Sequence, residues 1–267
     1  MRVSISLIIG GVLLGAMLIA AAVPDWFAPF DPLAFDYDAL SMPPSGDHWF
    51  GTDQFGRDVL SRIIHAARVD LQIAVFCVIF PLVLGGAIGL LVGWYGGILD
   101  AIFGRLVDLV VTFPFLVLVI FFVAVLGPGL VNVYIAVTCV GWVPYAKLMR
   151  AEVMVQAQND YVAAGKVLGY KMPRILLRHI LPNAARPVLV YAVTDMALAI
   201  LLGSSLGYLG LGAQPPTAEW GVLIADGKNF FTTAPWMALF PGLAIVLAGL
   251  GFSLTGDGLA DLLAVKR

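Results

Sequence analysis

Charge is scarce in this chain. Asp, Glu, Lys and Arg make up 12% of its 267 residues, about half of the roughly 25% that soluble globular domains carry. Hydrophobic residues make up 61%, and the mean hydropathy is +0.96. This composition excludes an ordinary soluble domain and favours a protein embedded in lipid. We expect no nucleic-acid partner.

Residues typical of catalytic and metal-binding motifs are also few. The two cysteines, Cys77 and Cys139, each lie in a long apolar run, where they are expected to act as small hydrophobic side chains. The sequence has no Gly-x-x-x-x-Gly-Lys-[Ser/Thr] phosphate loop, no His-Glu-x-x-His and no Cys-x-x-Cys. We therefore predict no catalytic residue, no metal site and no bound cofactor. If ATP drives this protein, another chain binds the nucleotide.

Apolar residues instead come in long runs. A bilayer core needs roughly 20 apolar residues per helix, and six stretches are close to that length. They are residues 3–23, 69–94, 106–126, 130–148, 187–209 and 236–254. The prediction is an all-α, polytopic membrane helix bundle with about six transmembrane helices.

The first run has two interpretations. Arg2 before it and Ala20 near its end are typical of a cleaved signal peptide. The run is longer, however, than the roughly 7–15-residue apolar region of such peptides. We therefore expect residues 1–23 to form an uncleaved N-terminal transmembrane anchor.

Basic residues indicate the orientation. The segment between the fourth and fifth runs is strongly basic, and such loops mark the cytoplasmic side of a bacterial-type inner membrane. Both termini are then cytoplasmic too, and the outer segments, 24–68 and 210–235, are the ones richer in acidic residues. The inner basic residues are Lys147, Arg150, Lys166, Lys171, Arg174, Arg178 and Arg186.

The outer segment 24–68 divides in two. Residues 24–45 are rich in Pro and Asp and are expected to be extended. Residues 48–68 carry charged and apolar side chains at helical spacing, which predicts an amphipathic helix leading into the second run. The charged residues there either form ion pairs four residues apart or contact a partner protein. They are Asp53, Arg57, Asp58 and Arg62.

Glycines recur every four residues in two of the runs. Gly85, Gly89 and Gly93 lie in the second run, and Gly203 and Gly207 in the fifth. Small residues at this spacing form a flat stripe that another helix can approach closely. We interpret both stripes as helix-packing surfaces.

The basic segment between the fourth and fifth runs holds the most informative pattern. Asn159 or Asp160 is a suitable N-cap for a short helix, and Gly169 can end that helix in the left-handed conformation. Pro173 suits the first turn of a second helix. Pro182 would end the second helix or bend it into the fifth run.

Small residues give the first of these helices a slim face. Ala163, Ala164 and Gly165 are adjacent in it, and a slim face fits a groove on a partner protein. The alternative is a basic amphipathic loop that lies on anionic lipid.

This segment resembles the cytoplasmic loop signature of inner-membrane subunits of binding-protein-dependent ABC importers. That signature reads Glu-Ala-Ala, three residues, Gly, nine residues, Ile, one residue, Leu-Pro. The matching positions here are Ala163, Ala164, Gly165, Gly169, His179, Leu181 and Pro182. Ala163 replaces Glu, Gly165 replaces Ala and His179 replaces Ile. Loss of the glutamate removes any contact that its carboxylate would make.

The resemblance extends over nearly the whole chain from residue 48. Segments on both sides of the loop resemble the second permease subunit of dipeptide, oligopeptide and nickel importers. They are residues 50–62, 208–221, 234–242 and 256–259.

The resemblance implies a type I importer permease fold, with a five-helix core in residues 69–267 and a coupling loop in 150–186. It implies a heterodimer with a second permease, two ATPase subunits that bind ATP and Mg, and an external solute-binding protein. The implied cargo is a di- or oligopeptide, with nickel chelates and glutathione as alternatives. The implied coupling residues are Asp160, Tyr161, Ala163, Ala164, Gly165, Gly169, Leu181 and Pro182.

Two further candidate sites lie outside this loop. Asp195 falls within the fifth run, where a carboxylate marks either a pathway or a structural pair. It either meets a substrate amino group or pairs with a donor on a neighbouring helix. By position and analogy, the outer loop 210–235 is a candidate outer gate or docking surface for the binding protein. Its candidate residues are Gln214, Pro215, Pro216 and Trp220.

Two other classes of protein fit the sequence less well. A membrane-embedded enzyme needs polar residues clustered at one depth, and Asp195 stands almost alone. An independent channel or ion-coupled transporter usually shows inverted repeats, or broken helices with several ionisable groups. We predict neither feature here.

Overall fold

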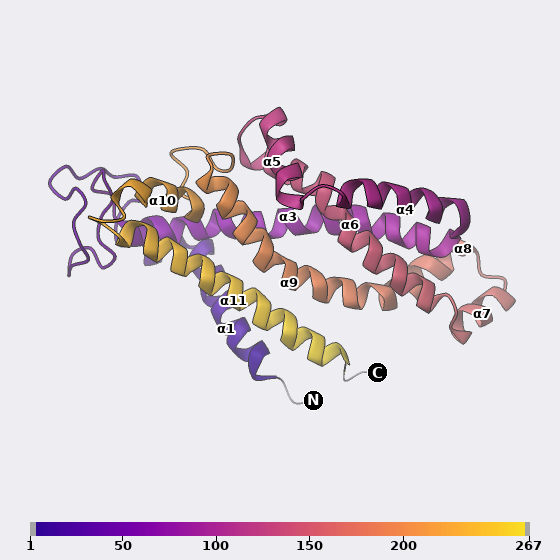
Figure 1. The fold of residues 1–267 in the computed structure, drawn as a ribbon. Helices are drawn as coiled ribbons and strands as arrows, with labels where there is room; N and C mark the ends of the chain where they lie inside the picture. The colour runs from indigo at the N-terminus through magenta and orange to yellow at the C-terminus, as the bar shows by residue number, and fades with distance from the viewer. Residues whose placement is uncertain (1–3, 265–267) are drawn as a thin grey trace.

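The computed structural model describes residues 4–264, and within that range it is built of helices and loops (Figure 1). Five helical stretches are long and apolar enough to cross a membrane. They are α1 (Ile5–Ala22), α3 (Val59–Tyr95), α6 (Leu130–Gln156), α9 (Leu181–Tyr208) with the short helix before it, and α11 (Trp236–Ala264). The predicted all-α membrane bundle is confirmed. Val3, where the first predicted run begins, lies outside the described residues.

The third predicted span is not a single helix. Residues 106–126 divide between α4 (Gly97–Val111) and α5 (Phe115–Leu126), which meet at an angle of 83°. The break lies before Pro114, because proline has no N–H to donate and disfavours the helical conformation in the residue before it. With about 1.5 Å of rise per residue, the 12 residues of α5 are too short to cross a bilayer. A broken span is therefore present where the sequence predicted an unbroken one.

The predicted amphipathic helix over residues 48–68 is correct only in its second half. Residues 48–58 form a loop in which Gly51 and Gly56 have φ of +72° and +76°, outside the helical region. The helix starts at Val59 and continues as α3 without interruption to Tyr95. Asp58 is its N-cap, and the Oδ2 atom of Asp58 accepts a hydrogen bond from the backbone N–H of Ser61 at 2.8 Å.

The charged residues of this segment form a buried cluster rather than pairs along one helix. Asp53 Oδ2 accepts hydrogen bonds from Arg57 Nε at 2.7 Å and from Arg62 Nη1 at 2.5 Å. Both arginines also approach Asp226 of α10 (Trp220–Gly227), at 3.7 and 3.5 Å. The cluster therefore fixes the outer loop to α3 and to α10.

The glycine stripe of α3 is the packing surface that the sequence predicted. The contact between α3 and α6 is the most extensive between any two helices in the described structure. A Cβ atom on Gly85 or Gly89 would collide with the backbone of α6, and one on Gly93 would lie 2.7 Å from the carbonyl oxygen of Arg150. Because backbone atoms cannot rotate away, the two helices need glycine at these positions.

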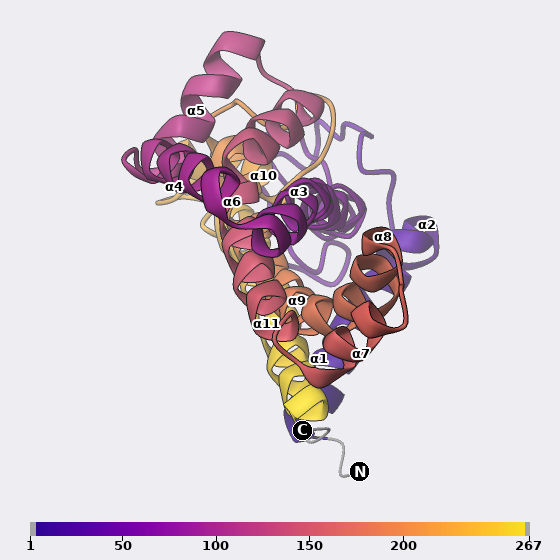
Figure 2. The same ribbon diagram turned by 90° about the vertical axis from the view of Figure 1, so that its right-hand side faces the viewer.

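The helices are arranged with two different ends (Figure 1). The loops of residues 28–58 gather with α10 at one end, and the short helix α7 (Asp160–Val167) lies at the other. α1 packs along α11, and α11 packs along α9. As a result the described ends of the chain lie near one another (Figures 1 and 2).

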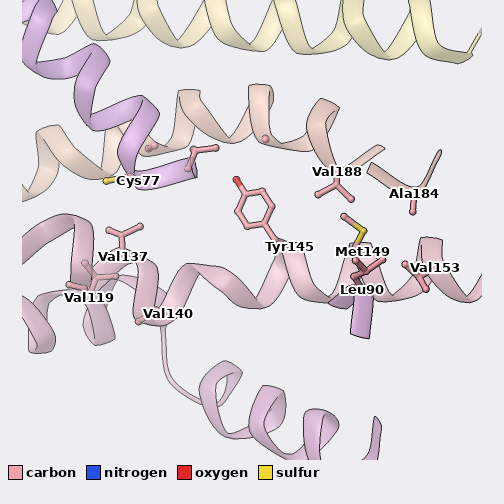
Figure 3. Close-up of a cluster of buried hydrophobic side chains, with 14 of the residues drawn as sticks. Cys77, Leu90, Val119, Val137, Val140, Tyr145, Met149, Val153, Ala184 and Val188 are labelled. Carbon is pink, nitrogen blue, oxygen red and sulfur yellow. The ribbon is translucent and has the colours of Figure 1, made fainter. Parts of the chain in front are cut away.

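The main core lies between α3, α6 and α9, with Val119 and Val123 of α5 completing it. Figure 3 shows Val137, Val140 and Tyr145 on α6 among these buried side chains. Tyr145 is 1% exposed and points from α6 towards α9.

Candidate functional site

The loop between α6 and α9 folds as the sequence predicted in most respects. Asn159 is the N-cap residue of α7, and its carbonyl oxygen accepts from the N–H of Val162 at 3.0 Å. Its side chain does not cap the helix; instead it donates to Gln156 Oε1 at 3.1 Å. The hydroxyl of Tyr161 donates to the same oxygen at 2.7 Å. Gln156, the last residue of α6, thus fixes the start of α7.

The two faces of α7 differ. Val162 and Gly165 point inwards, and a Cβ on Gly165 would lie 3.6 Å from the ring of Tyr170. Gly165 is therefore not on the slim outer face where the sequence placed it beside Ala163 and Ala164. Both alanines are exposed.

The exposed end of α7 is apolar. The side chain of Val167 is 88% exposed and that of Leu168 is 68% exposed. No other part of the described chain covers these two side chains. An apolar patch flanked by two alanines is suited to burial in a cleft of another protein.

Charged and aromatic contacts connect this loop to the membrane helices. The Lys166 ammonium lies 5.1 Å from the ring centroid of Trp94, near the end of α3. On α6, Arg150 forms a bidentate pair with Asp100 of α4, with Nε–Oδ1 and Nη2–Oδ2 distances of 2.5 and 2.7 Å. α7 therefore contacts the end of α3 through Lys166, and Arg150 separately joins α6 to α4.

Gly169 ends this part of the loop with a φ of +75°, as predicted. We expect Gly169→Val to reduce transport strongly without unfolding the bundle, because a β-branched residue in the left-handed region costs about 1–2 kcal/mol. Gly169→Asn is the matched control, since asparagine tolerates this conformation. Uptake and thermal unfolding of both variants check this, and normal uptake by Gly169→Val would contradict it.

The second short helix is continuous with the fifth span. α8 (Met172–Ile175) begins with Pro173 in its first turn, as predicted, and passes through one π-helical turn, η1 (Leu176–Ile180), into α9. Pro182 lies in the first turn of α9 and does not end a helix. The wider turn before it accommodates the missing N–H of proline. Leu181, at the start of α9, packs against the main core. It is therefore separate from the exposed face of α7.

Asp195 lies on α9 in the middle of the bundle. Its Oδ2 atom accepts a hydrogen bond of 2.6 Å from the hydroxyl of Tyr145 on α6. It also lines a cavity of about 490 Å³. The structural pair, one of the two alternatives from the sequence, is therefore present. The pathway role of Asp195 stays a prediction.

The outer candidate residues do not form one surface. Gln214, Pro215 and Pro216 are exposed, but Trp220 is 1% exposed. The indole Nε1 of Trp220 donates to the carbonyl oxygen of Ile63 at 3.1 Å. Trp220 offers no exposed surface for docking in this structure, because its side chain packs against α3. Its role at an outer gate, the other alternative, stays a prediction.

Two buried carboxylates at the start of α10 were missed. Asp70 of α3 accepts from the N–H of Trp220 at 3.1 Å, and Glu219 accepts from the N–H groups of Gly221 and Val222 at 2.7 and 3.0 Å. Burial raises the pKa of the Glu219 carboxyl above its ordinary value. Together they cap α10 and bind it to α3. A carboxylate inside an apolar run was the signal that would have identified Asp70.

Neither a nucleophile motif nor a metal-binding group forms a site in the described residues. Residues 203–207 fit a Gly-x-Ser-x-Gly pattern, but they lie within α9 rather than on the strand-to-helix turn that a nucleophile elbow requires. Within the described residues no group of three His, Cys, Asp or Glu side chains is placed to hold a metal ion.

Comparisons with known proteins agree with this architecture. Residues 85–266 match the model of the family described as binding-protein-dependent transport system inner membrane component. A dipeptide transport system permease protein of Alkalihalophilus pseudofirmus is 44% identical over 84% of this chain and 73% of its own length. A probable D,D-dipeptide transport system permease protein of Escherichia coli is 40% identical over 96% of this chain and 86% of its own. A glutathione transport system permease protein of Pectobacterium atrosepticum is 38% identical over 94% and 84%. The chain therefore belongs to the family of inner-membrane permease components of binding-protein-dependent transport systems, and has the fold of a type I ABC importer permease.

Proposed function

We propose that this chain is the permease subunit of an ATP-driven importer that takes up di- and oligopeptides from a solute-binding protein by alternating access. The observation that carries the proposal is the 40–44% identity to permeases named for dipeptide transport. The chain spans most of the length of each of those relatives. The family match covers residues 85–266, a range that contains residues 150–186.

The proposed partners are a second, homologous permease, two ATPase subunits and the binding protein. The ATPase subunits bind ATP and Mg, and one of them receives α7 in a cleft. Four residues form the proposed contact: Asp160, Ala163, Ala164 and the exposed Val167. Tyr161, Gly165 and Gly169 hold α7 in shape, and Leu181 and Pro182 set the start of α9. Closure of the ATPase pair then moves α7, and through it α3 and α6.

The proposed orientation places α7 and both termini in the cytoplasm, and the loops around α10 outside. A single cysteine at Gln158, with Cys77 and Cys139 replaced by alanine, tests this. We expect an impermeant thiol reagent to label it only after the cells are permeabilised, because a basic loop stays inside. Labelling in intact cells would reverse the topology. In this orientation the exposed Gln214, Pro215 and Pro216 remain candidates for the outer gate or for docking of the binding protein.

Glutathione is the second candidate cargo, because several relatives at 38–40% identity are named as glutathione permeases. Nickel chelates and other small solutes are further alternatives. Transport by the complete complex in proteoliposomes separates these possibilities. We expect ATP-dependent accumulation of a radiolabelled dipeptide that excess unlabelled dipeptide abolishes and excess glutathione does not. Competition by glutathione alone would favour the second cargo, and uptake without ATP would indicate an ion-coupled transporter.

A further inference from the structure

The cavity beside Asp195 is suited to a small organic molecule. Its volume of about 490 Å³ is within the roughly 300–1,000 Å³ of known ligand pockets. It opens among α5, α6 and α9, and Cys77 of α3 contributes to its wall. Most of its lining is apolar, including Phe115 and Leu116 at the start of α5, directly after the broken span.

The depth of this cavity matches a transport pathway. Tyr145 lies near the middle of α6 (Leu130–Gln156), and Asp195 lies near the middle of α9 (Leu181–Tyr208). Substrate sites of transporters commonly lie near the centre of the bilayer and beside interrupted helices. The cavity has both features.

The described lining of the cavity carries an acidic side chain and no basic one. Asp195 is the one ionisable acid or base of the Asp, Glu, Lys, Arg and His types among the described residues that line it. Tyr145 donates to Oδ2, and no donor in the described chain is within hydrogen-bonding distance of Oδ1. A carboxylate at this depth is normally paired with a cation or with donors that satisfy both oxygens. The described chain therefore supplies a donor for Oδ2 of Asp195 and none for Oδ1.

Aromatic rings complete the site. The rings of Tyr145 and Tyr191 meet edge to face, with centroids 5.2 Å apart and an interplanar angle of 71°. Both line the cavity together with Asp195. Tyr145 is buried and acts through its hydroxyl, whereas the half-buried ring of Tyr191 beside the carboxylate favours an organic cation over an anion.

We propose that Asp195, with Tyr145 and Tyr191, binds the free α-ammonium group of a peptide as it passes the middle of the membrane. The ammonium donates to Oδ1, while the Tyr145 hydroxyl keeps the carboxylate turned into the cavity. This inference rests on the proposed function and adds a selectivity step inside the permease, separate from selection by the binding protein.

Direct binding tests the inference without the binding protein. The complete complex of both permeases and both ATPase subunits is placed in lipid nanodiscs and titrated with radiolabelled dialanine or N-acetyl-dialanine, with and without a non-hydrolysable ATP analogue. In the wild-type complex we expect dialanine to bind at least tenfold more tightly than the acetylated peptide, which lacks the ammonium.

Variants identify the residue responsible. Asp195→Asn keeps an acceptor for Tyr145 and is expected to weaken dialanine binding at least tenfold, without affecting N-acetyl-dialanine. Asp257→Asn makes the same chemical change at an exposed residue of α11 outside the cavity, and this control is expected to bind both peptides as the wild type does. Equal affinity of the wild type for the two peptides, no binding of dialanine, or unchanged binding by Asp195→Asn would each overturn the inference. A wild-type complex that imports dipeptide with ATP but does not discriminate contradicts this inference alone, whereas one that imports no peptide contradicts the proposed function.

Discussion

Replacing Ala164 with tryptophan is expected to abolish ATP-driven uptake while the helix bundle remains folded. Ala164 lies on the exposed, slim face of α7 and has no role in the packing of that helix. An indole ring at this position prevents α7 from entering a narrow cleft. Loss of a central interface contact costs about 2–4 kcal/mol, so we expect association with the ATPase subunits to weaken about 100-fold, by roughly 2.8 kcal/mol.

Uptake, ATPase binding and thermal unfolding measured on the same preparations check this result. Ala164→Ser is the matched control, because serine keeps the face slim, and at least half of the uptake should remain. An Ala164→Trp complex that transports normally would show that α7 does not enter a cleft.

Gly89→Leu is expected to have the largest effect on the stability of the bundle. A side chain at this position meets the carbonyl oxygen of Ala146 and the backbone of α6 around it. The helices then move apart along the most extensive contact of the fold. Overpacking of a close contact costs about 1–3 kcal/mol or more, and we expect a value near the upper end, because the obstacle is backbone.

The comparison for this variant is Gly11→Leu on α1, where no atom lies within 4 Å of a Cβ. The unfolding transition of Gly11→Leu in detergent should match that of the wild type, whereas Gly89→Leu should unfold at lower denaturant concentration or fail to accumulate. Equal stability of the two variants would contradict the packing that we describe for α3 and α6.

The sequence predicted the features that depend on local chemistry. Long apolar runs located five membrane helices, because few other structures tolerate such composition. The four-residue glycine spacing located a packing surface on α3, and the structure shows that α6 packs there. Gly169 marked the end of the first short helix, and Pro173 marked the start of the second. Each residue has a strong backbone preference.

The features that the sequence did not predict depend on contacts between distant residues. The charged pattern of residues 48–58 has helical spacing, but Arg57 and Arg62 pair with Asp53 and also approach Asp226, far along the chain on α10. Trp220 is buried because its indole finds an acceptor on α3. Asp70 and Glu219 converge on the start of α10 from different parts of the chain. Two of these features had a local signal in the sequence: Pro114 at the broken span, and the carboxylate of Asp70 inside an apolar run.

The central claim is that α7 connects this permease to ATPase subunits. The most direct test is to tag the C-terminus, purify the chain from native membranes and identify its partners by mass spectrometry. The experiment is then repeated with residues 160–169 replaced by a short Gly-Ser linker. We expect the intact chain to bring down a second permease and ATPase subunits, and the shortened chain to retain the permease but lose the ATPase subunits. An intact chain that purifies alone, or ATPase subunits that remain bound without α7, would contradict the claim.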